Sequence, residues 1–383
     1  MTGQRAASSN ISVQAVEGRA LTVDFLRLPE RLYREDPAWV SPLLLEQKHR
    51  VFNNTPFLEH AITHAWVAYA GDQPIGRITA QLDRLQPGAD EGAVGYFGML
   101  EAIDDAAVFR DLTGAAEDWL REQGAAWIRG PYNLSINEEV GLLVENFSEP
   151  PFFMMGHARP YYGPRLEEQG YSGIKDLLTY MIDTSDYEPS ASLQRLAGRS
   201  KSSVRVRPLN RQTRKADFEI MRDIFNDGWS GNWGFVPFTR REFQEMGSML
   251  SLLLDHDYVQ IAEINERPVA FIVALPNVNE AIADLDGRLF PFGWIKLLWR
   301  LRLQRSRTAR IALMGVRREL QHSRLGPTLA FMVIDAAART VIRRGVQRVE
   351  MGWILEDNSA MRHIIEDVGG AIYKRYRIYQ KKL

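Results

Sequence analysis

Polar side chains able to bind a ligand or accept a proton follow a predicted strand that ends at Gly130-Pro131. The run contains Asn133, Ser135, Asn137, Glu138 and Glu139. Loops at strand ends commonly present the binding and catalytic groups of a scaffold. The alternative is a turn whose Asn and Ser side chains bond their own local backbone. The residue types therefore leave two interpretations, the lining of a substrate cleft or a local turn.

The composition excludes several kinds of chemistry. No cysteine occurs among the 383 residues, which excludes disulfides, thiolate nucleophiles and Cys-ligated metal centres. The formal charge of -1 argues against binding nucleic acid through the overall field of the protein. We expect no metal and no nucleic-acid partner. The N-terminus lacks the apolar core of a secretory signal, and no run of about 18 apolar residues is present, so we expect a cytoplasmic protein.

The segment 287–310 mixes apolar, aromatic and basic residues and contains no acidic one. Its basic residues are Arg288, Lys296, Arg300, Arg302, Arg305, Arg307 and Arg310. Such a mixture is typical of an interfacial helix that docks on anionic lipid, which would place the protein peripherally on the inner membrane. The alternative is a helix packed over the mouth of an active site. Nucleic-acid binding is disfavoured because it leaves the bulky apolar residues without a purpose.

The elements that must position these residues occur in the same order twice, which indicates an internal duplication. Each half has a strand, two helices, a hairpin, a third strand, a long helix, a strand, a short helix and a closing strand. The first half covers residues 11–183 and the second covers 204–383, where a final strand pair closes the order. The Ser-rich segment 184–203 contains Pro189 and is predicted to connect the two domains.

The order of elements in the second half resembles the acyl-CoA-binding core of the GNAT superfamily. The family fingerprint, Gln or Arg followed by two small residues at the start of the long helix, is matched by Gln321 and Gly326, with Arg324 in place of the middle Gly. Such a turn points backbone N–H groups at the pyrophosphate of CoA, and Arg324 would add a charged contact. Asn358 matches the family's helix cap, whereas Ile365 replaces its usual proton-donating Tyr. The CoA-binding residues that the resemblance implies are Met314, Gly315, Val316, Gln321, His322, Ser323, Arg324, Leu325, Gly326 and Asn358.

Four longer segments narrow the resemblance. GPYNLSINEEVGLL, PYYGPRLEEQGY, NWGFVPFT and WILEDN together are similar to tandem GNAT-like bacterial proteins, a group that includes bacterial ceramide synthases. The resemblance implies an α/β (α+β) fold of two tandem GNAT domains. It also implies N-acylation of a lipid amine, such as a long-chain sphingoid base, with acyl-CoA as co-substrate. The acidic residues 101–105 replace the phosphate loop in the first half, so we expect that half not to bind CoA.

The reaction that the resemblance implies assigns roles to particular residues. A backbone N–H near Met314, Gly315 and Val316 would hold the thioester carbonyl, and one such donor is worth about 3 kcal/mol. An alkyl amine titrates near pH 10, so a base should help. The candidate bases are Glu356, Glu139 and His157, and the substitute acids are Tyr373 and Tyr376. Glu356 is alternatively a helix N-terminal acid, and His157 alternatively fixes a loop.

The acceptor site has two predicted parts. Asn133, Ser135 and Asn137 would line the amine cleft. The acceptor pocket would be shaped by Asn232, Trp233, Phe235 and Trp353. The Trp and Phe side chains would form an apolar wall for a lipid chain, although they suit a protein core equally well.

Two other functions remain open at this point. One is an aminoacyl-tRNA-dependent transferase acting on cell-wall peptides, which requires a tRNA-binding surface beyond the segment 287–310. The other is a non-catalytic membrane-surface protein that binds acyl-CoA through a degenerate loop.

Overall fold

The computed structural model describes residues 11–86, 92–200, 203–253, 255–303, 306–323 and 325–383. Its contacts divide the chain into two compact units. The first comprises Met1–Asp176, Leu285–Leu289 and Tyr376–Leu383, and the second comprises Leu177–Asp284 and Phe290–Arg375. Two strands, β9 (Ser172–Asp183) and β15 (Ala371–Lys382), begin in one unit and end in the other.

The first unit is a mixed sheet with the strand order β1-β2-β3-β4-β5-β15. Its other elements are β1 (Ile11–Ala15), α1 (Gly18–Leu32), α2 (Leu44–Phe52), η1 (Pro56–Glu59), β2 (Ala61–Ala70), β3 (Gln73–Asp83), β4 (Val94–Ala102), α3 (Ala106–Glu122), β5 (Trp127–Gly130), β6 (Tyr132–Asn133), β7 (Glu139–Val140), β8 (Leu142–Glu145) and α4 (Tyr162–Glu168). Helix α3 packs so closely on one face that a Cβ at Gly95 would lie 2.3 Å from Leu120. On the other face, Phe25 of α1 packs with Val67 and Tyr69.

The second unit repeats this plan with the strand order β9-β14-β13-β12-β11-β10. Its elements are η2 (Thr184–Asp186), α5 (Ala191–Ser200), β10 (Val204–Pro208), α6 (Arg214–Trp229), α7 (Arg240–Leu253), η3 (His256–Tyr258), β11 (Val259–Ile264), β12 (Arg267–Pro276), α8 (Val278–Ile282), α9 (Gly293–Leu303), β13 (Thr308–Val316), α10 (Arg318–Gln321), α11 (Gly326–Arg343), β14 (Arg348–Leu355) and α12 (Ser359–Asp367).

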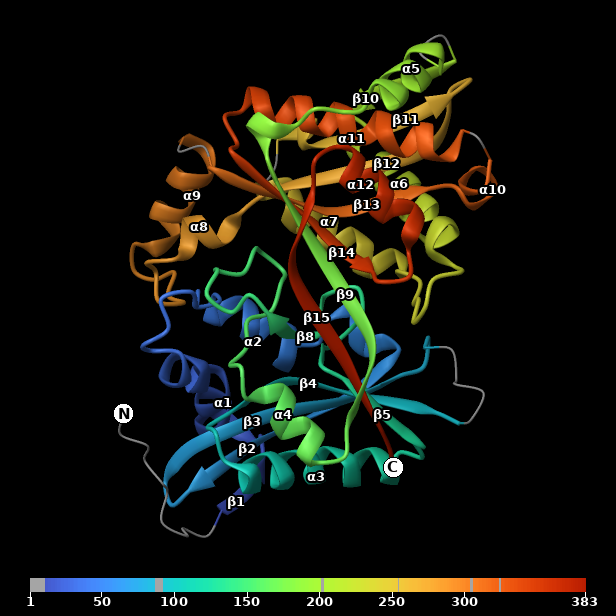
Figure 1. The fold of residues 1–383 in the computed structure, drawn as a ribbon. Helices are drawn as coiled ribbons and strands as arrows, with labels where there is room; N and C mark the ends of the chain where they lie inside the picture. The colour runs from blue at the N-terminus through green and yellow to red at the C-terminus, as the bar shows by residue number, and fades with distance from the viewer. Residues whose placement is uncertain (1–10, 87–91, 201–202, 254, 304–305, 324) are drawn as a thin grey trace. The chain divides into compact units, whose positions relative to one another are not determined.

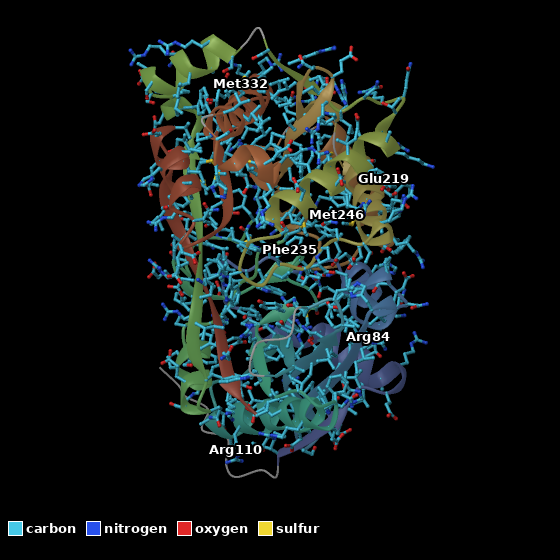
Figure 2. The ribbon with its side chains drawn as sticks, turned by 90° about the vertical axis from the view of Figure 1, so that its right-hand side faces the viewer. Arg84, Arg110, Glu219, Phe235, Met246 and Met332 are labelled. Atoms are coloured by element: carbon cyan, nitrogen blue, oxygen red, sulfur yellow. The ribbon has the colours of Figure 1, made fainter. Side chains whose placement is uncertain are left out.

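Helices cover both faces of this second sheet (Figure 1). On one face, Leu329 and Val333 of α11 pack with Ile272 of β12. On the other face, a Cβ at Gly315 of β13 would meet Ile224 of α6 at 3.3 Å. Figure 2 shows the side chains that fill these layers, with Met332 of α11 and Phe235 of the α6–α7 connection labelled.

The predicted fold class is confirmed, and so is the repeated order of elements. In each unit the one parallel strand pair among the described pairings, β4 with β5 and β13 with β14, is connected through the long helix α3 or α11. The final strand pair expected in the second half is instead the single strand β15, because nothing in residues 371–382 interrupts the extended chain.

The segment 184–203 is more than a connection between domains. Most of it forms η2 and α5, and α5 packs on α11 with Leu193 and Ala197 in the core of the second unit. The expected boundaries also differ from the two units. The end of β9 belongs to the second unit because it pairs with β14, and the end of β15 belongs to the first because it pairs with β5.

The packing of α5 predicts unequal effects for two leucines one turn apart. Leu193 is buried, whereas Leu196 is 42% exposed. We expect Leu193→Ala to lower the free energy of unfolding by about 2–4 kcal/mol, because it leaves a cavity in the core. The control Leu196→Ala should change it by less than about 0.5 kcal/mol. Urea denaturation followed by tryptophan fluorescence measures both, and equal effects would show that α5 does not belong to the core.

Candidate active site

The parallel strands of the second unit separate part of the way along their length. The ladder between β13 and β14 ends at the pair of Ile311 with Met351. Strand β13 nevertheless continues to Val316, and β14 continues to Leu355. We call residues 312–316 of β13 together with residues 352–355 of β14 the opening of the second unit (Figure 1).

Irregularities in both strands accompany this separation. The register between β12 and β13 shifts so that Ala312 has no partner on β12. The register between β9 and β14 shifts between Met351 and Ile354. A bulge bends its strand and increases the local twist, so β13 and β14 turn away from each other directly after the pair of Ile311 with Met351. The backbone edges that face the opening are therefore not paired with each other.

The predicted carbonyl-binding residues lie on the β13 side of the opening. The carbonyl of Met314 accepts a hydrogen bond from Trp229 Nε1 at 2.8 Å. The carbonyl of Val316 accepts one from Gln321 Nε2 at 2.9 Å, and the same nitrogen donates to Gly228 O at 2.7 Å. Gln321 was predicted to contact CoA, but here its side chain ties the end of α6 to the end of β13.

The predicted phosphate turn leads into α11 as expected from the sequence. Ser323 Oγ donates to Leu320 O and accepts from the N–H of Leu325. A Cβ on Gly326 would lie 2.6 Å from two carbonyl oxygens, so only glycine fits at the first residue of α11. Among the described residues, no side chain caps this helix at its N-cap residue Leu325. His322 is exposed, and Arg324 lies outside the described residues.

An aromatic group lies at the opening. Trp229 of α6 contacts Trp353 of β14 edge to face, with ring centroids 5.8 Å apart, and stacks on Phe225 at 5.0 Å. Phe235 lies 6.3 Å from Phe225. Asn232 turns the chain through backbone bonds to Trp229 and Phe235. Trp229 was missed in the sequence, although its place at the end of the helix before NWGF was a usable signal.

The short helix after β14 begins at the predicted cap. Asn358 Oδ1 accepts from the N–H of Met361 at 3.2 Å, which confirms the cap. Ile365 is buried in the apolar core, so this position offers no proton donor. Glu356 follows β14 directly and is half-buried. Tyr373 is half-buried, whereas Tyr376, assigned to the first unit, is fully buried.

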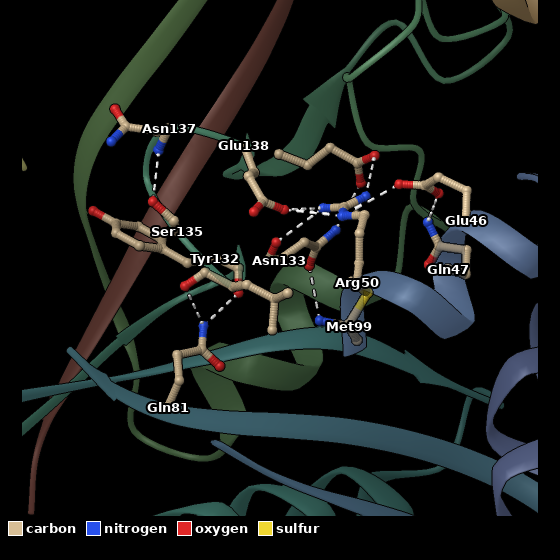
Figure 3. Close-up of polar contacts among 12 residues, drawn as sticks. Glu46, Gln47, Arg50, Gln81, Met99, Tyr132, Asn133, Ser135, Asn137 and Glu138 are labelled. Carbon is tan, nitrogen blue, oxygen red and sulfur yellow. Dashed lines mark hydrogen bonds and ion pairs between the residues drawn. The ribbon is translucent and has the colours of Figure 1, made fainter. Parts of the chain in front are cut away.

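The corresponding parallel pair of the first unit also separates, but its own chain fills the space. Strands β4 and β5 pair only from Val94 to Tyr96 of β4. Beyond that point, Asn133 Oδ1 accepts from the N–H of Met99 at 2.8 Å, and Gln81 Nε2 donates to Tyr132 O at 2.7 Å (Figure 3). A Cβ at Gly98 would lie 1.8 Å from Tyr132 O, so the filling segment passes directly over the strand.

The predicted amine-cleft residues belong to this filling segment of the first unit. Arg50 binds Glu138 at 2.6 Å and Glu139 at 3.4 Å, and Asn133 Nδ2 donates to Glu139 at 2.9 Å (Figure 3). Burial raises the pKa of Glu138, although Arg50 acts in the opposite direction. Ser135 Oγ accepts from the N–H of Asn137. The structure shows a turn held by its own side chains, while a role in binding an amine stays a prediction.

His157 is held in place by an acid. Its Nε2 lies 3.0 Å from Asp36 Oδ2, and its side chain is only 3% exposed. Burial alone would raise the pKa of Asp36, but the hydrogen bond from His157 and the charge of Arg159 lower it. These contacts match the interpretation that His157 fixes a loop, and its role as a base is untested.

The long helix of the first unit begins differently from α11. Asp105 caps α3 by accepting from the N–H of Ala107 at 2.8 Å. Glu101, at the end of β4, accepts from Tyr33 and Tyr162 at 2.7 Å each. An aspartate thus occupies the helix start in the first unit, whereas the start of α11 has no capping side chain.

Two curated relatives match nearly the whole chain. Protein YghO of Escherichia coli strain K12 is 48% identical over 359 residues, which are 94% of this chain and 92% of the relative. The bacterial ceramide synthase of Caulobacter vibrioides is 44% identical over 378 residues, 98% of each chain. No family profile matches the sequence.

Solved structures show the same fold at low identity. A tandem GNAT protein from the clavulanic acid biosynthesis pathway aligns with a TM-score of 0.56 at 12% identity, over 97% of this chain and 98% of its own. A GCN5-related glucosamine N-acetyltransferase region of a fungal β-N-acetylglucosaminidase aligns with a TM-score of 0.59 at 14% identity, over 98% of this chain and 38% of its own.

The repeated sheet with separating parallel strands, together with these relatives, defines a tandem GNAT N-acyltransferase. The chain belongs to the family that contains YghO and the bacterial ceramide synthase of Caulobacter vibrioides.

Within the described residues, no helix is long and apolar enough to cross a membrane. In the same ranges, no group of three or more His, Cys, Asp or Glu side chains is arranged to hold a metal ion.

Close packing at the end of α6 gives a test of this site. A Cβ at Gly228 would lie 2.4 Å from Val316 O, whereas a Cβ at Gly198 of α5 meets nothing within 4 Å. We expect Gly228→Ala to push α6 away from β13 and to lower the free energy of unfolding by about 1–3 kcal/mol. Gly198→Ala should leave stability unchanged or raise it by up to about 1 kcal/mol. Thermal denaturation compares them, and a neutral Gly228→Ala would contradict the close contact.

Proposed function

We propose that the second unit transfers a long acyl chain from acyl-CoA to the amine of a long-chain lipid base, of which a sphingoid base is one example. The observation that carries the proposal is the opening between β13 and β14 beside the start of α11, a helix without a capping side chain. The relative named bacterial ceramide synthase supports the lipid class of the acceptor.

The opening suits the amide-containing arm of CoA. The carbonyls of Met314, Val316 and Gly352 already accept hydrogen bonds from side chains. Every second residue of a strand turns its N–H and C=O toward the same edge, so the ligand would bind the remaining backbone groups of β13 and β14. The first turn of α11 has backbone N–H groups without intrahelical partners and a partial positive charge, which favour the pyrophosphate. The turn from His322 to Gly326 would hold that group, and Arg324 would add a charged contact.

For amide formation the protein must supply a donor to the negative oxygen, a base for the amine and an acid for the thiolate. The amine attacks the thioester carbonyl carbon, a C–N bond forms, and the negative oxygen would be held by a backbone N–H of residues 314–316. The C–S bond breaks, and the thiolate takes up a proton. Glu356 is the proposed base because it follows β14 at the end of the opening. Tyr373 is the proposed acid because it is half-buried, in contrast to Tyr376.

We propose that the first unit does not bind CoA. Its opening is filled by Tyr132 and Asn133, and the Asn133 carboxamide already uses the N–H of Met99. The cap from Asp105 also places negative charge where a pyrophosphate would need positive charge.

The lipid substrate accounts for an exposed apolar face on α9. Trp294, Ile295, Leu298 and Trp299 are each 44–52% exposed, and Phe292 just before the helix is 73% exposed. Positions 294, 295, 298 and 299 lie on one side of the helix because residues three and four apart are neighbours. Bulky apolar groups of this kind are normally covered, so a contiguous exposed set marks an interaction surface.

We propose an anionic bilayer as the partner of α9 because basic side chains accompany its apolar face. Lys296 and Arg300 lie beside the apolar face and bind Asp284, with Arg300 Nη2 3.0 Å from Asp284 Oδ2. Hydrogen bonds from Arg300 and Lys296 lower the pKa of Asp284, so it stays ionised and steadies the helix. Arg310, which the sequence placed in this basic surface, is instead buried in β13 because residues 308–310 already belong to that strand.

The acyl transfer is tested with purified protein, palmitoyl-CoA and sphinganine. We expect an amide product by mass spectrometry and an equal amount of free CoA, because one C–S bond breaks for each C–N bond formed. Reactions without sphinganine are the control for thioester hydrolysis. Protection from thermal unfolding by palmitoyl-CoA without product would favour a non-catalytic acyl-CoA-binding protein. The absence of both the amide product and the thermal protection would refute the proposal and reopen the aminoacyl-tRNA alternative.

The membrane role is tested by replacing both indoles of α9. We expect Trp294→Ser with Trp299→Ser to weaken co-sedimentation with vesicles of phosphatidylglycerol and phosphatidylcholine by at least about tenfold. The variant loses two indoles that would become buried in the bilayer. Ile342→Ser is the matched control, since Ile342 is 40% exposed on α11. Unchanged binding of the double variant, or an equal loss in the control, would contradict docking through α9.

A further inference from the structure

Four buried polar residues cross the sheet of the second unit where the opening begins. They come from neighbouring strands and are Lys374 of β15, Thr179 of β9, Glu350 of β14 and Arg310 of β13. Their exposed fractions are 1%, 0%, 0% and 4%. Burying charges costs much free energy unless they are paired, so a charged row inside a sheet calls for a specific explanation.

The row lies on the face of the sheet that α6 covers. Ala309 and Val349, the neighbours of Arg310 and Glu350, pack with Val341 of α11. Successive residues of a strand point to opposite faces, so Arg310 and Glu350 point away from α11. They are also direct partners in the ladder, one pair before its end. The ion pair therefore lies one residue pair before the point where the two strands separate.

Arg310 reaches beyond the end of the ladder. Its Nη2 donates to Gly352 O at 3.0 Å, while its Nε lies 3.5 Å from Glu350 Oε2. Gly352 is the first β14 residue of the opening, and a Cβ there would lie 2.9 Å from Thr179 Cγ2. The guanidinium thus binds one backbone acceptor of β14 beyond the end of the ladder. The carboxylate of Glu350, on the same strand as Gly352, attracts the guanidinium through its charge.

We infer that Arg310, anchored by Glu350, is a positioning residue that holds β14 away from β13 and so presets the width of the opening for acyl-CoA. The inference rests on the proposed function, because it assumes that acyl-CoA occupies the opening. A planar guanidinium with several donors can bind a carboxylate and a carbonyl together, which a lysine ammonium does less well. We call the Arg310 guanidinium bound to Gly352 O the wedge. Without the wedge, β13 and β14 lose the contact that fixes their separation, and the ligand must order the two strands when it binds.

The test replaces Arg310 alone. Arg310→Met leaves the buried Glu350 carboxylate beside the charge of Lys374, so neither becomes a lone charge in the core. We expect the KM for palmitoyl-CoA to rise about tenfold, the effect of one lost hydrogen bond to a charged donor. The KM for sphinganine should stay within about twofold, because the wedge acts on the acyl-CoA side. Arg310→Lys retains a charge beside Glu350 and should give an intermediate KM for palmitoyl-CoA.

A matched control removes a different ion pair of the same unit. Arg207 of β10 binds the buried Asp217 at 2.9 Å. Arg207→Met with Asp217→Asn should lower the thermal midpoint but leave the KM for palmitoyl-CoA unchanged.

An unchanged KM for palmitoyl-CoA in the Arg310 variants, or an equal rise in the control, would overturn the inference. If the Arg310→Met variant does not fold, the KM values of Arg310→Lys for palmitoyl-CoA and for sphinganine decide the test. Failure of the wild type to bind palmitoyl-CoA in equilibrium dialysis would instead overturn the proposed function.

Discussion

The incomplete pairing of two parallel strands is the constraint on which this protein depends. A parallel ladder normally continues while both strands remain extended, because unpaired backbone groups are costly when buried. Here β13 and β14 separate after four residue pairs, with Ala312 bulged on one strand and an irregularity after Met351 on the other. Side chains satisfy the carbonyls of Met314, Val316 and Gly352. The proposed ligand would satisfy backbone groups that remain.

The two units show two solutions to the same backbone problem. In the first, the chain satisfies its own opening with the Asn133 carboxamide, and Asp105 caps the following helix. In the second, Trp229 and Gln321 bond carbonyls of β13, and Arg310 bonds Gly352 O at the point of separation. Among the described residues, no side chain caps α11 at its N-cap residue Leu325. This difference supports the proposal that the second unit binds acyl-CoA and the first does not.

Two arginines close together in the sequence, Arg300 and Arg310, have different roles in the structure. Arg300 holds α9 through Asp284, and the apolar face of that helix is exposed, as the proposed membrane role requires. Arg310 comes only ten residues later in the sequence, yet it is buried and acts on a backbone carbonyl. The same residue type serves a surface in one case and the geometry of the site in the other, because a strand begins between them.

From the sequence alone came the turn before α11, the cap at Asn358 and the repeated order of elements, because local periodicity and residues close together in the chain indicate each element. The fold class came from the resemblance to tandem GNAT-like proteins. The sequence did not determine that Gln321 and Asn133 bond the chain's own backbone, that α5 belongs to the core, or that Arg310 is buried. Those outcomes depend on which strand or helix lies opposite each side chain. Trp229 meets Trp353, and Arg310 meets Gly352, only because sheet register brings distant segments together, and that register is a property of the tertiary structure.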